Sequence, residues 1–453
     1  MRGKKKKSAC KSEQGIIITL VAVFMLGVIG AMAALSIDVV TLYTARSEAQ
    51  LSADSAALAA ARVIANSGAT SDTTGTLNLL NAVEASPGPA QSIALQVAEQ
   101  NQIAGSTLTA AQVTVTFGGT NLPANPTVKV TIQKNDLPTF FARIWGRTQF
   151  AVAATATAEA YNPSILQGTG AGPGIPIAPT CVKPWLLPNM SPTSGAGKPI
   201  FTAASGAIAD TTLLGWQTPT APGPTSYKLR TDCTTNCATT PAPQTWRYYP
   251  GTTDPAGDFP APSSTSCTGC AGYTPYELSI AGCVQTPVAC NAIVHVDTTS
   301  YQGTTRDTQT GTAVNSLIHS TGNGGDTVDT ALNSPPSGSD PFQFLPGSEN
   351  PDVLSGPLAS SDIITVSDSL VTVPVIDTTT AWPPKSTIFP SVQIIGFVQL
   401  FLSPDGTTVP PFNGHVTTRV INLVGCGDGT GGAAGQQIIG NGGSPVAVRL
   451  ITP

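Results

Sequence analysis

The feature that constrains this chain most is a run of 23 consecutive residues without a formal charge, Gly15–Ile37, which is rich in isoleucine, leucine and valine. A helix of that length is about 34 Å long, which is enough to cross a hydrocarbon core of roughly 30 Å. Soluble cores seldom contain such a run next to a cluster of lysines. The sequence therefore predicts a transmembrane helix over residues 15–37.

The charges on the two sides of this run differ in sign. Six of the 21 basic residues precede the first acidic residue, Glu13, and they are Arg2, Lys4, Lys5, Lys6, Lys7 and Lys11. The chain from Glu13 onward carries 15 basic and 26 acidic residues, a balance of −11. Because basic flanks stay on the cytoplasmic side, we expect a single-pass protein with a cytoplasmic basic tail at 1–14 and everything after residue 38 outside.

Two other interpretations of the apolar run stay open. A cleaved secretory signal also has a basic start, an apolar stretch and a small-residue site such as Ala31-Met32-Ala33, although this run is long for that purpose. A buried core helix is the second alternative. A mature protein that starts at Ala34 or Leu35 would identify a signal peptide.

Helix-forming residues continue beyond the run. Residues 38–66 contain no glycine or proline and are rich in good helix formers, and Gly68 is a stop signal. One helix from about Ile16 to Asn66 would be roughly 75 Å long. Its small residues allow another helix or a sheet to approach closely, and we expect packing against other helices, or over the next domain's core, through Ala49, Ala53, Ala56, Ala57 and Ala60.

A series of short motifs follows the same course around the apolar run: Glu13-Gln14-Gly15, Asp38-Val39, Leu42-Tyr43, Arg46, Gln50 and Ala53-Asp54-Ser55-Ala56-Ala57-Leu58-Ala59. This order resembles the N-terminal segment of the TadE/TadG-like membrane proteins of the Flp (tight adherence) pilus assembly system. The resemblance implies a bacterial inner-membrane protein with a structural, assembly or adhesion role and a periplasmic or cell-surface ectodomain. It implies the lipid bilayer and other Flp/Tad pilus proteins as partners.

The resemblance also bears on processing. Relatives cut by prepilin peptidase carry a glutamate five residues after the glycine, whereas this chain has Leu20 at that distance from Gly15. We therefore favour an uncleaved, TadG-like protein. A filament subunit matured after Gly15 would instead begin at Ile16.

Residues 38–161 are predicted to form a pilin-like unit in which the helix packs on a small antiparallel sheet, an α+β arrangement. Apolar spacing indicates two short helices, around 77–83 and 93–98. Phe140 and Phe141, on a short helix that Pro138 opens, are expected to fill the gap between sheet and helix. Alternating apolar residues predict half-buried strands at 113–117, 128–132 and 150–158.

The composition changes at Asn162. The last 292 residues hold 34 of the 39 prolines and eight of the nine cysteines. We expect a Pro/Gly-rich linker at 162–179 and a β-rich ectodomain with long loops at 180–453. Its strands are expected at 363–366, 370–376, 392–401, 416–424 and 446–451.

The cysteines after the apolar run suggest disulfides in an oxidising compartment, and they are Cys181, Cys233, Cys237, Cys267, Cys270, Cys283, Cys290 and Cys426. Eight cysteines allow 105 pairings, so the connectivity stays open. A zinc site from the Cys233/Cys237 and Cys267/Cys270 pairs is an alternative, and a thioredoxin-like use of the second pair is another. Cys10 is expected to be a free cytoplasmic thiol.

The sequence offers little for catalysis. His295, His319 and His415 lack the spacing of a helical metal site, and neither an Asp-x-Ser-x-Ser motif nor a phosphate loop occurs. Residues 322–326 faintly resemble a calcium-binding repeat, but a single copy predicts only a turn. The net charge of −5 argues against a nucleic-acid partner. We predict no enzyme, cofactor, metal or small-molecule substrate; the alternative is a secreted or surface-bound hydrolase or carbohydrate-binding module with a cleaved signal.

Overall fold

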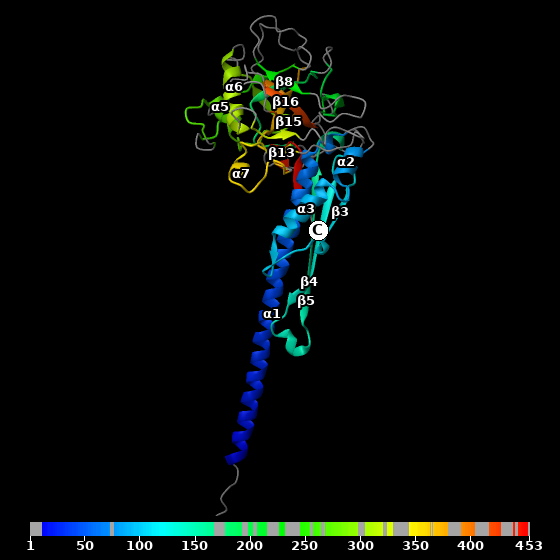
Figure 1. The fold of residues 1–453 in the computed structure, drawn as a ribbon, viewed down its shortest axis with the longest axis vertical. Helices are drawn as coiled ribbons and strands as arrows, with labels where there is room; N and C mark the ends of the chain where they lie inside the picture. Colours follow the sequence, from blue (N-terminus) through cyan, green and yellow to red (C-terminus); the bar gives the residue numbers. More distant parts are fainter. Residues whose placement is uncertain are drawn as a thin grey trace, which may run out of the picture.

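Helix α1 (Lys11–Asn66) is one uninterrupted helix of 56 residues, about 84 Å long at 1.5 Å per residue. It ends just before Gly68, whose backbone is left-handed with φ 82°, a conformation that glycine adopts without strain. The helix predicted to end at Asn66 is therefore confirmed. Figure 1 shows α1 running from the N-terminal end of the molecule to a head that contains most of the later strands.

The structure is a computed structural model, which describes residues 11–72, 77–166, 177–192, 198–202, 206–214, 226–231, 245–253, 257–263, 267, 269–297, 304–319, 324–328, 344–362, 364, 366–378, 391–403, 416–426, 438–439 and 443–451. Several residues named above lie outside these ranges, namely Arg2, Lys4, Lys5, Lys6, Lys7, Cys10, Cys233, Cys237 and His415.

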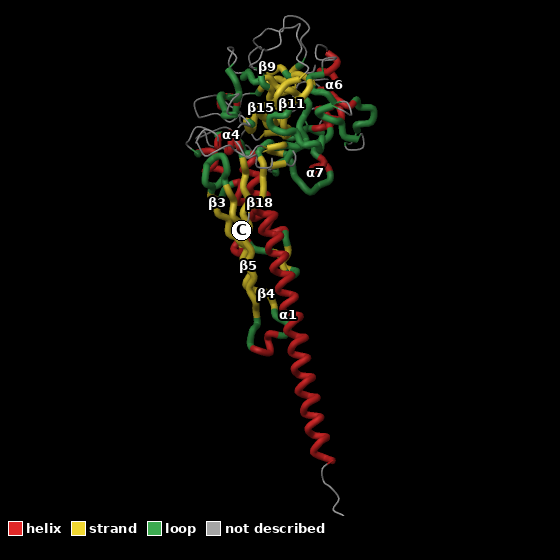
Figure 2. Tube along the Cα trace, turned by 180° about the vertical axis from the view of Figure 1, so that it is seen from behind, coloured by secondary structure: helices red, strands yellow, loops and turns green. Residues whose placement is uncertain are grey.

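A four-stranded antiparallel sheet lies along the upper part of α1, in the order β18-β5-β4-β3. Three of its strands, β3 (Val113–Gly118), β4 (Thr127–Pro138) and β5 (Gln149–Tyr161), confirm the predicted ones. Alternate residues of β4 and β5 are buried because only one face of the sheet packs against helix. Together with α2 (Asn78–Val83) and α3 (Pro89–Gln100), the sheet makes a two-layer α+β stalk (Figure 2).

The fourth strand of this sheet corrects the predicted domain limits. Strand β18 (Ala447–Ile451) pairs antiparallel with β5, with Leu450 opposite Ala158. The chain therefore returns from the head to the stalk, and a division at 180–453 cuts through a sheet. Composition could not show this, because a short apolar strand carries no signal for the partner it pairs with.

The head contains a mixed sheet of eight strands among the described residues, in the order β10-β7-β14-β15-β16-β8-β9, with β11 also on β15. Its three central strands confirm the predicted ones. The bounds are β7 Trp185–Pro188, β8 Tyr227–Arg230, β9 Thr245–Arg247, β10 Tyr249–Pro250, β11 Ile293–His295, β14 Leu370–Ile376, β15 Ser391–Leu402 and β16 Val416–Gly425.

Two helices of the head were not predicted. Helix α5 (Pro275–Ala281) begins at a capping box of Thr274 and Glu277, and α6 (Thr304–Leu317) is mostly threonine, glutamine and asparagine. Both helices contribute buried side chains to the head core, α5 through Ile280 and α6 through Val314. Helix α6 is too polar to show the apolar period that normally reveals a helix, and α5, with seven residues, is too short to show it.

The remaining elements are short. Of the strand predicted at 363–366, Ile364 forms a single bridge to Phe344, while residues 363 and 365 lie outside the described ranges. The short elements are η1 Ala69–Ser71, β1 Gln102–Ile103, β2 Ser106–Thr107, η2 Ala110–Gln112, η3 Ala142–Trp145, α4 Pro163–Leu166, β6 Ile177–Ala178, η5 Thr211–Leu213, β12 Thr327–Val328, β13 Phe344–Leu345, α7 Pro351–Leu354 and β17 Ile438–Ile439.

A buried polar network joins the end of α1 to the head. Asn422 on β16 donates through Nδ2 to the carbonyl of Ala65 (2.5 Å) and to Oε1 of Gln399 (2.6 Å). Gln399 in turn donates to Oδ1 of Asn66 (3.1 Å). Because a buried polar group without a partner costs about 1–3 kcal/mol, this network favours one arrangement of the stalk helix relative to the head.

Three disulfides lie in the described part of the head. Cys181 bonds Cys283, Cys290 bonds Cys426, and Cys267 bonds Cys270. The Cys290–Cys426 bond ties the end of the central strand β16 to a residue 136 positions earlier. With Cys267 and Cys270 bonded to each other, these two thiols are not free to serve as zinc ligands.

Replacing Cys290 and Cys426 together by serine should lower the stability of the head by about 2–5 kcal/mol, since cross-linking a long loop restricts the unfolded chain. Thermal unfolding of the purified full chain, followed by circular dichroism, measures the effect. The matched control is the Cys267→Ser/Cys270→Ser variant, which opens a loop of only three residues and should change the melting temperature less. Equal losses in the two variants would contradict this assignment.

Candidate functional site: the exposed apolar half of helix α1

The N-terminal part of α1 is apolar and lies outside the packed core. Every described side chain from Gly15 to Ala33 is exposed except Ala31, which is half-buried, and Leu26 reaches 73% exposure. By length and composition α1 is able to cross a membrane, with a mean hydropathy of 2.7 in its most apolar window. Folded proteins in water rarely leave an apolar surface of this size uncovered.

The upper half of α1 buries the alanine face that the sequence singled out. Ala49, Ala53, Ala56, Ala57 and Ala60 are each 0% exposed and belong to the core shared with β4, β5 and α3. The close approach predicted from their small size is made to this chain's own sheet and helix. This face is therefore covered, and contact with another protein must use a different side of α1.

An outward stripe on α1, defined by Val40, Tyr43 and Leu51, is the side that stays uncovered. These three side chains are 63%, 78% and 66% exposed. They are three and eight residues apart, close to one and two helical turns, so they line one face. The sequence analysis did not predict this stripe, because it considered only the alanines on the opposite face of the helix. The spacing of Val40, Tyr43 and Leu51 is the signal that could have predicted it.

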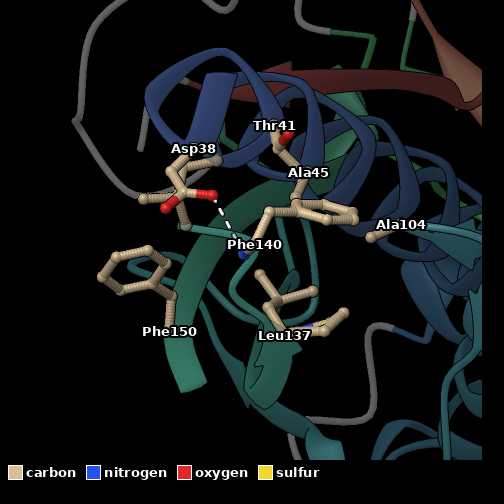
Figure 3. Close-up of a pocket in the computed structure, with 9 residues that line it drawn as sticks. Asp38, Thr41, Ala45, Ala104, Leu137, Phe140 and Phe150 are labelled. Atoms are coloured by element: carbon tan, nitrogen blue, oxygen red, sulfur yellow. Dashed lines mark hydrogen bonds between the residues drawn. The ribbon is translucent and has the colours of Figure 1, made fainter. Parts of the chain in front are cut away.

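Asp38 marks the boundary between the exposed and the packed halves of α1. Its side chain is 3% exposed and accepts hydrogen bonds from three consecutive backbone N–H groups, those of Phe140 (3.0 Å), Phe141 (3.1 Å) and Ala142 (2.7 Å). Figure 3 shows the carboxylate directed at this turn, beside a shallow pocket lined by Leu137 and Phe150.

The three N–H groups open the short helix η3, which Gly146 ends with φ 80°. The first N–H groups of any helix lack intrahelical partners, and here a carboxylate from a distant helix satisfies them. Bonds to a charged acceptor are stronger than neutral ones, about 1.5–3 kcal/mol each. Asp38 therefore fixes the tip of the β4–β5 hairpin onto α1.

The aromatic residues of this turn do not lie where the sequence placed them. Phe140 is 60% exposed, Phe141 is 36% exposed and Ile144 is 74% exposed, so they do not fill the gap between sheet and helix. The core between the helix and the sheet is made mainly by small side chains of α1 and β5, and Phe140 and Phe141 are not part of it.

The two histidines that the structure describes, His295 and His319, have carboxylate partners. His295 lies on β11, and its Nδ1 is 3.1 Å from Oδ2 of Asp258. His319 Nε2 is 2.7 Å from Oδ2 of Asp368, and this hydrogen bond raises the pKa of His319. Among the residues that the structure describes, neither imidazole ring has a serine or cysteine side chain as hydrogen-bond partner.

Lys183 is the most strongly perturbed cation in the head. Burial lowers its pKa to about 7, while the carboxylate of Asp368 opposes this shift. Its Nζ donates to the carbonyls of Ile280 (2.6 Å) and Gly282 (2.7 Å), at the C-terminal end of α5, where carbonyls lack intrahelical partners. Lys183 therefore caps the C-terminal end of α5 by donating hydrogen bonds to these carbonyls.

The acidic residue of the glycine-rich 322–326 segment, Asp326, is engaged in hydrogen bonds within the protein. Asp326, at the end of the glycine-rich 322–326 segment, accepts hydrogen bonds from the Gly347 N–H (3.0 Å), Asn350 Nδ2 (2.8 Å) and Ser367 Oγ (2.5 Å). Within the part of the chain that is described, no group of three or more His, Cys, Asp or Glu side chains is placed to hold a metal ion.

The structure thus combines an exposed apolar helix, long enough to cross a membrane, with a folded α+β stalk into which that helix continues. Residues 17–63 match the Tad family, whose members are Flp pilus-assembly, TadE/G-like proteins. The matched segment is α1 from its exposed apolar part to the end of its alanine face. The family is one of pilus-assembly components and not a known enzyme family. No curated protein and no solved structure matches the chain.

Replacing Asp38 by alanine should release the hairpin tip while preserving α1. Amide hydrogen exchange at Phe140, Phe141 and Ala142 is expected to rise roughly ten- to a hundredfold, which corresponds to the loss of about 1.5–3 kcal/mol. Exchange followed by mass spectrometry on the full chain in detergent measures this. The control is Asp54→Ala, because the Asp54 carboxylate accepts a bond from Gln50 within α1 (2.8 Å); faster exchange at the tip in that variant, or none in Asp38→Ala, would contradict the assignment.

Proposed function

We propose that this protein is a single-pass, membrane-anchored structural component of the Flp (tight adherence) pilus system, with an assembly or adhesion role. One observation carries the proposal: the helix that matches the Tad family is exposed over its apolar part from Gly15 to Ala33, except at Ala31, and packed over its alanine-rich part. The bilayer would cover the exposed part, because water does not solvate apolar side chains favourably.

The orientation follows from charge. The basic residues before Glu13 stay in the cytoplasm, while the stalk and head, whose part of the chain is acidic overall, lie in the periplasm or at the cell surface of a bacterial cell. Disulfides persist in oxidising compartments, and the three in the head support this orientation.

The partner surface in this proposal is the outward stripe of Val40, Tyr43 and Leu51. It begins just beyond the predicted span and faces away from the chain's own sheet, since the alanines occupy the sheet side. Apolar side chains at helical spacing are suited to pack against a second helix. We propose that a helix of another Flp/Tad pilus protein lies along this stripe.

A photo-crosslinking amino acid at Tyr43 or Leu51 should therefore yield adducts with another protein of the pilus machinery in the native bacterium. The same amino acid at Thr116, an exposed position on β3, serves as the control and should give no such adduct. Mass spectrometry of the adducts identifies the partner. Absence of adducts from both stripe positions, or the same adducts from Thr116, would contradict an assembly role for this stripe.

The intact mass of the purified protein separates this proposal from a secreted hydrolase or carbohydrate-binding module. A mature chain that starts at Ala34 or Leu35 would mean that the apolar segment is removed, and the anchor proposal would fail. A chain that starts at Ile16 would keep the anchor but make the protein a processed, filament-type subunit.

A further inference from the structure

The tip of the β4–β5 hairpin, residues 139–148, exposes large apolar side chains. Phe140 is 60% exposed and Ile144 is 74% exposed, whereas Leu137, where the strand meets the tip, is 3% exposed. The burial of the hairpin therefore changes abruptly at its end. Because loop tips in water normally carry small or polar residues, these uncovered side chains need a separate explanation.

The tip lies where the apolar part of α1 ends. Ala34, at 7% exposure, is the first buried residue of α1, and it lies one turn before Asp38 on the same face. Helix η3 of the tip contacts α1, and Figures 1 and 2 both show the hairpin end beside α1, with the helix continuing past it. The 20 residues from Gly15 to Ala34 span about 30 Å, the thickness of a hydrocarbon core.

The charges of the tip suit a lipid headgroup region. Arg143 and Arg147 are exposed, and residues 139–148 contain no acidic residue. The nearest carboxylates are otherwise engaged, Asp38 with the backbone of the turn and Asp136 with Lys134 at 3.2 Å. Arginine side chains next to apolar ones typically lie at the interface, with the guanidinium near phosphates.

We propose that the hairpin tip is a second membrane contact, which inserts Phe140 and Ile144 at the boundary between headgroups and acyl chains while Arg143 and Arg147 bind lipid phosphates. This inference rests on the proposed anchoring by α1, because the level of the tip is set by where that helix leaves the bilayer. Asp38 holds the tip at this level. The occupant is lipid, because the tip is continuous with the surface of α1 that faces the acyl chains.

The contact has a mechanical consequence. Transmembrane helices are tilted by about 20° on average. The polar network at Asn422 couples α1 to the head, so the head would tilt with the helix. A second attachment beside the helix restrains that tilt in the plane of the hairpin. The tip would therefore set the direction in which the head points away from the membrane.

The test uses the full chain in nanodiscs that contain anionic lipid, with an environment-sensitive fluorophore on an introduced cysteine in a Cys10→Ser background. Ile144→Cys reports on the tip, and Leu26→Cys reports on the predicted span. Thr120→Cys is the control, because it is exposed in the loop between β3 and β4, at the opposite end of β4 from the tip. The Cys10→Ser protein without an added cysteine measures background labelling.

We expect the label at Ile144 to show blue-shifted emission and strong quenching by lipids that carry a nitroxide near the headgroup. The label at Leu26 should be quenched best by a nitroxide deep in the acyl chain, and the label at Thr120 should not be quenched. Replacing Arg143 and Arg147 by glutamine should reduce the quenching at Ile144 when the nanodiscs contain anionic lipid.

Three results would overturn the inference. If Leu26 is quenched but Ile144 is not, α1 is an anchor and the tip is not a membrane contact. If neither is quenched, the anchor itself fails. Blue-shifted emission at Ile144 without quenching by any lipid nitroxide would mean that the tip binds protein, either a second copy or another helix, and the lipid assignment would be wrong.

Discussion

The structure depends on the close packing of one alanine face of α1 against a sheet whose inner face is also small. Ala53, Ala56 and Ala60 are completely buried, and Ala156 and Ala158 of β5 are 3% and 0% exposed. Small side chains on both surfaces let the helix and sheet backbones approach closely, and dispersion contacts accumulate over that area. This packing holds the stalk rigidly along the helix and leaves the opposite face of α1 open.

That division of α1 explains the placement of the other features. The alanine face of α1 ends where the sheet ends. At that point Asp38 accepts hydrogen bonds from the N–H groups of the hairpin turn and so attaches the turn to α1. Below it α1 is apolar on all sides, and above it the open face carries the outward stripe. At the other end, the Asn422 network and the return of β18 to β5 join the head to the stalk.

Much of this arrangement could be predicted from the sequence where local chemistry decides it. The uncharged run and the absence of glycine and proline up to Asn66 predict the helix α1. The alternation of apolar and polar residues within 113–161 predicts the stalk strands β3, β4 and β5. The pairing of β18 with β5, the disulfide connectivity and the partner of Asp38 could not be predicted. Each of these joins segments far apart in the chain, and the local sequence of one segment does not identify the other as its partner.

The contacts of the candidate site on α1 were also beyond what the local sequence could predict. The alanines were recognised as a packing surface, but their partner is this chain's own sheet, because residues 127–161 fold back along the helix. Phe140 and Phe141 are expected in the core because phenylalanine is among the residue types most often buried. Their exposure depends on how far the hairpin extends past the alanine face, and that length is a tertiary property.

The central claim is that α1 crosses the bilayer with the stalk and head outside the cytoplasm. Labelling with a membrane-impermeant maleimide in intact spheroplasts tests it most directly, using native Cys10 and, in a Cys10→Ser background, Thr116→Cys and Phe24→Cys; Thr116 is exposed on β3 and lies outside the stripe proposed to bind a partner. The account predicts labelling of Thr116→Cys in intact spheroplasts, of Cys10 only after permeabilisation, and of Phe24→Cys only in denaturing detergent. Labelling of Cys10 in intact cells, or of Phe24→Cys without detergent, would contradict it.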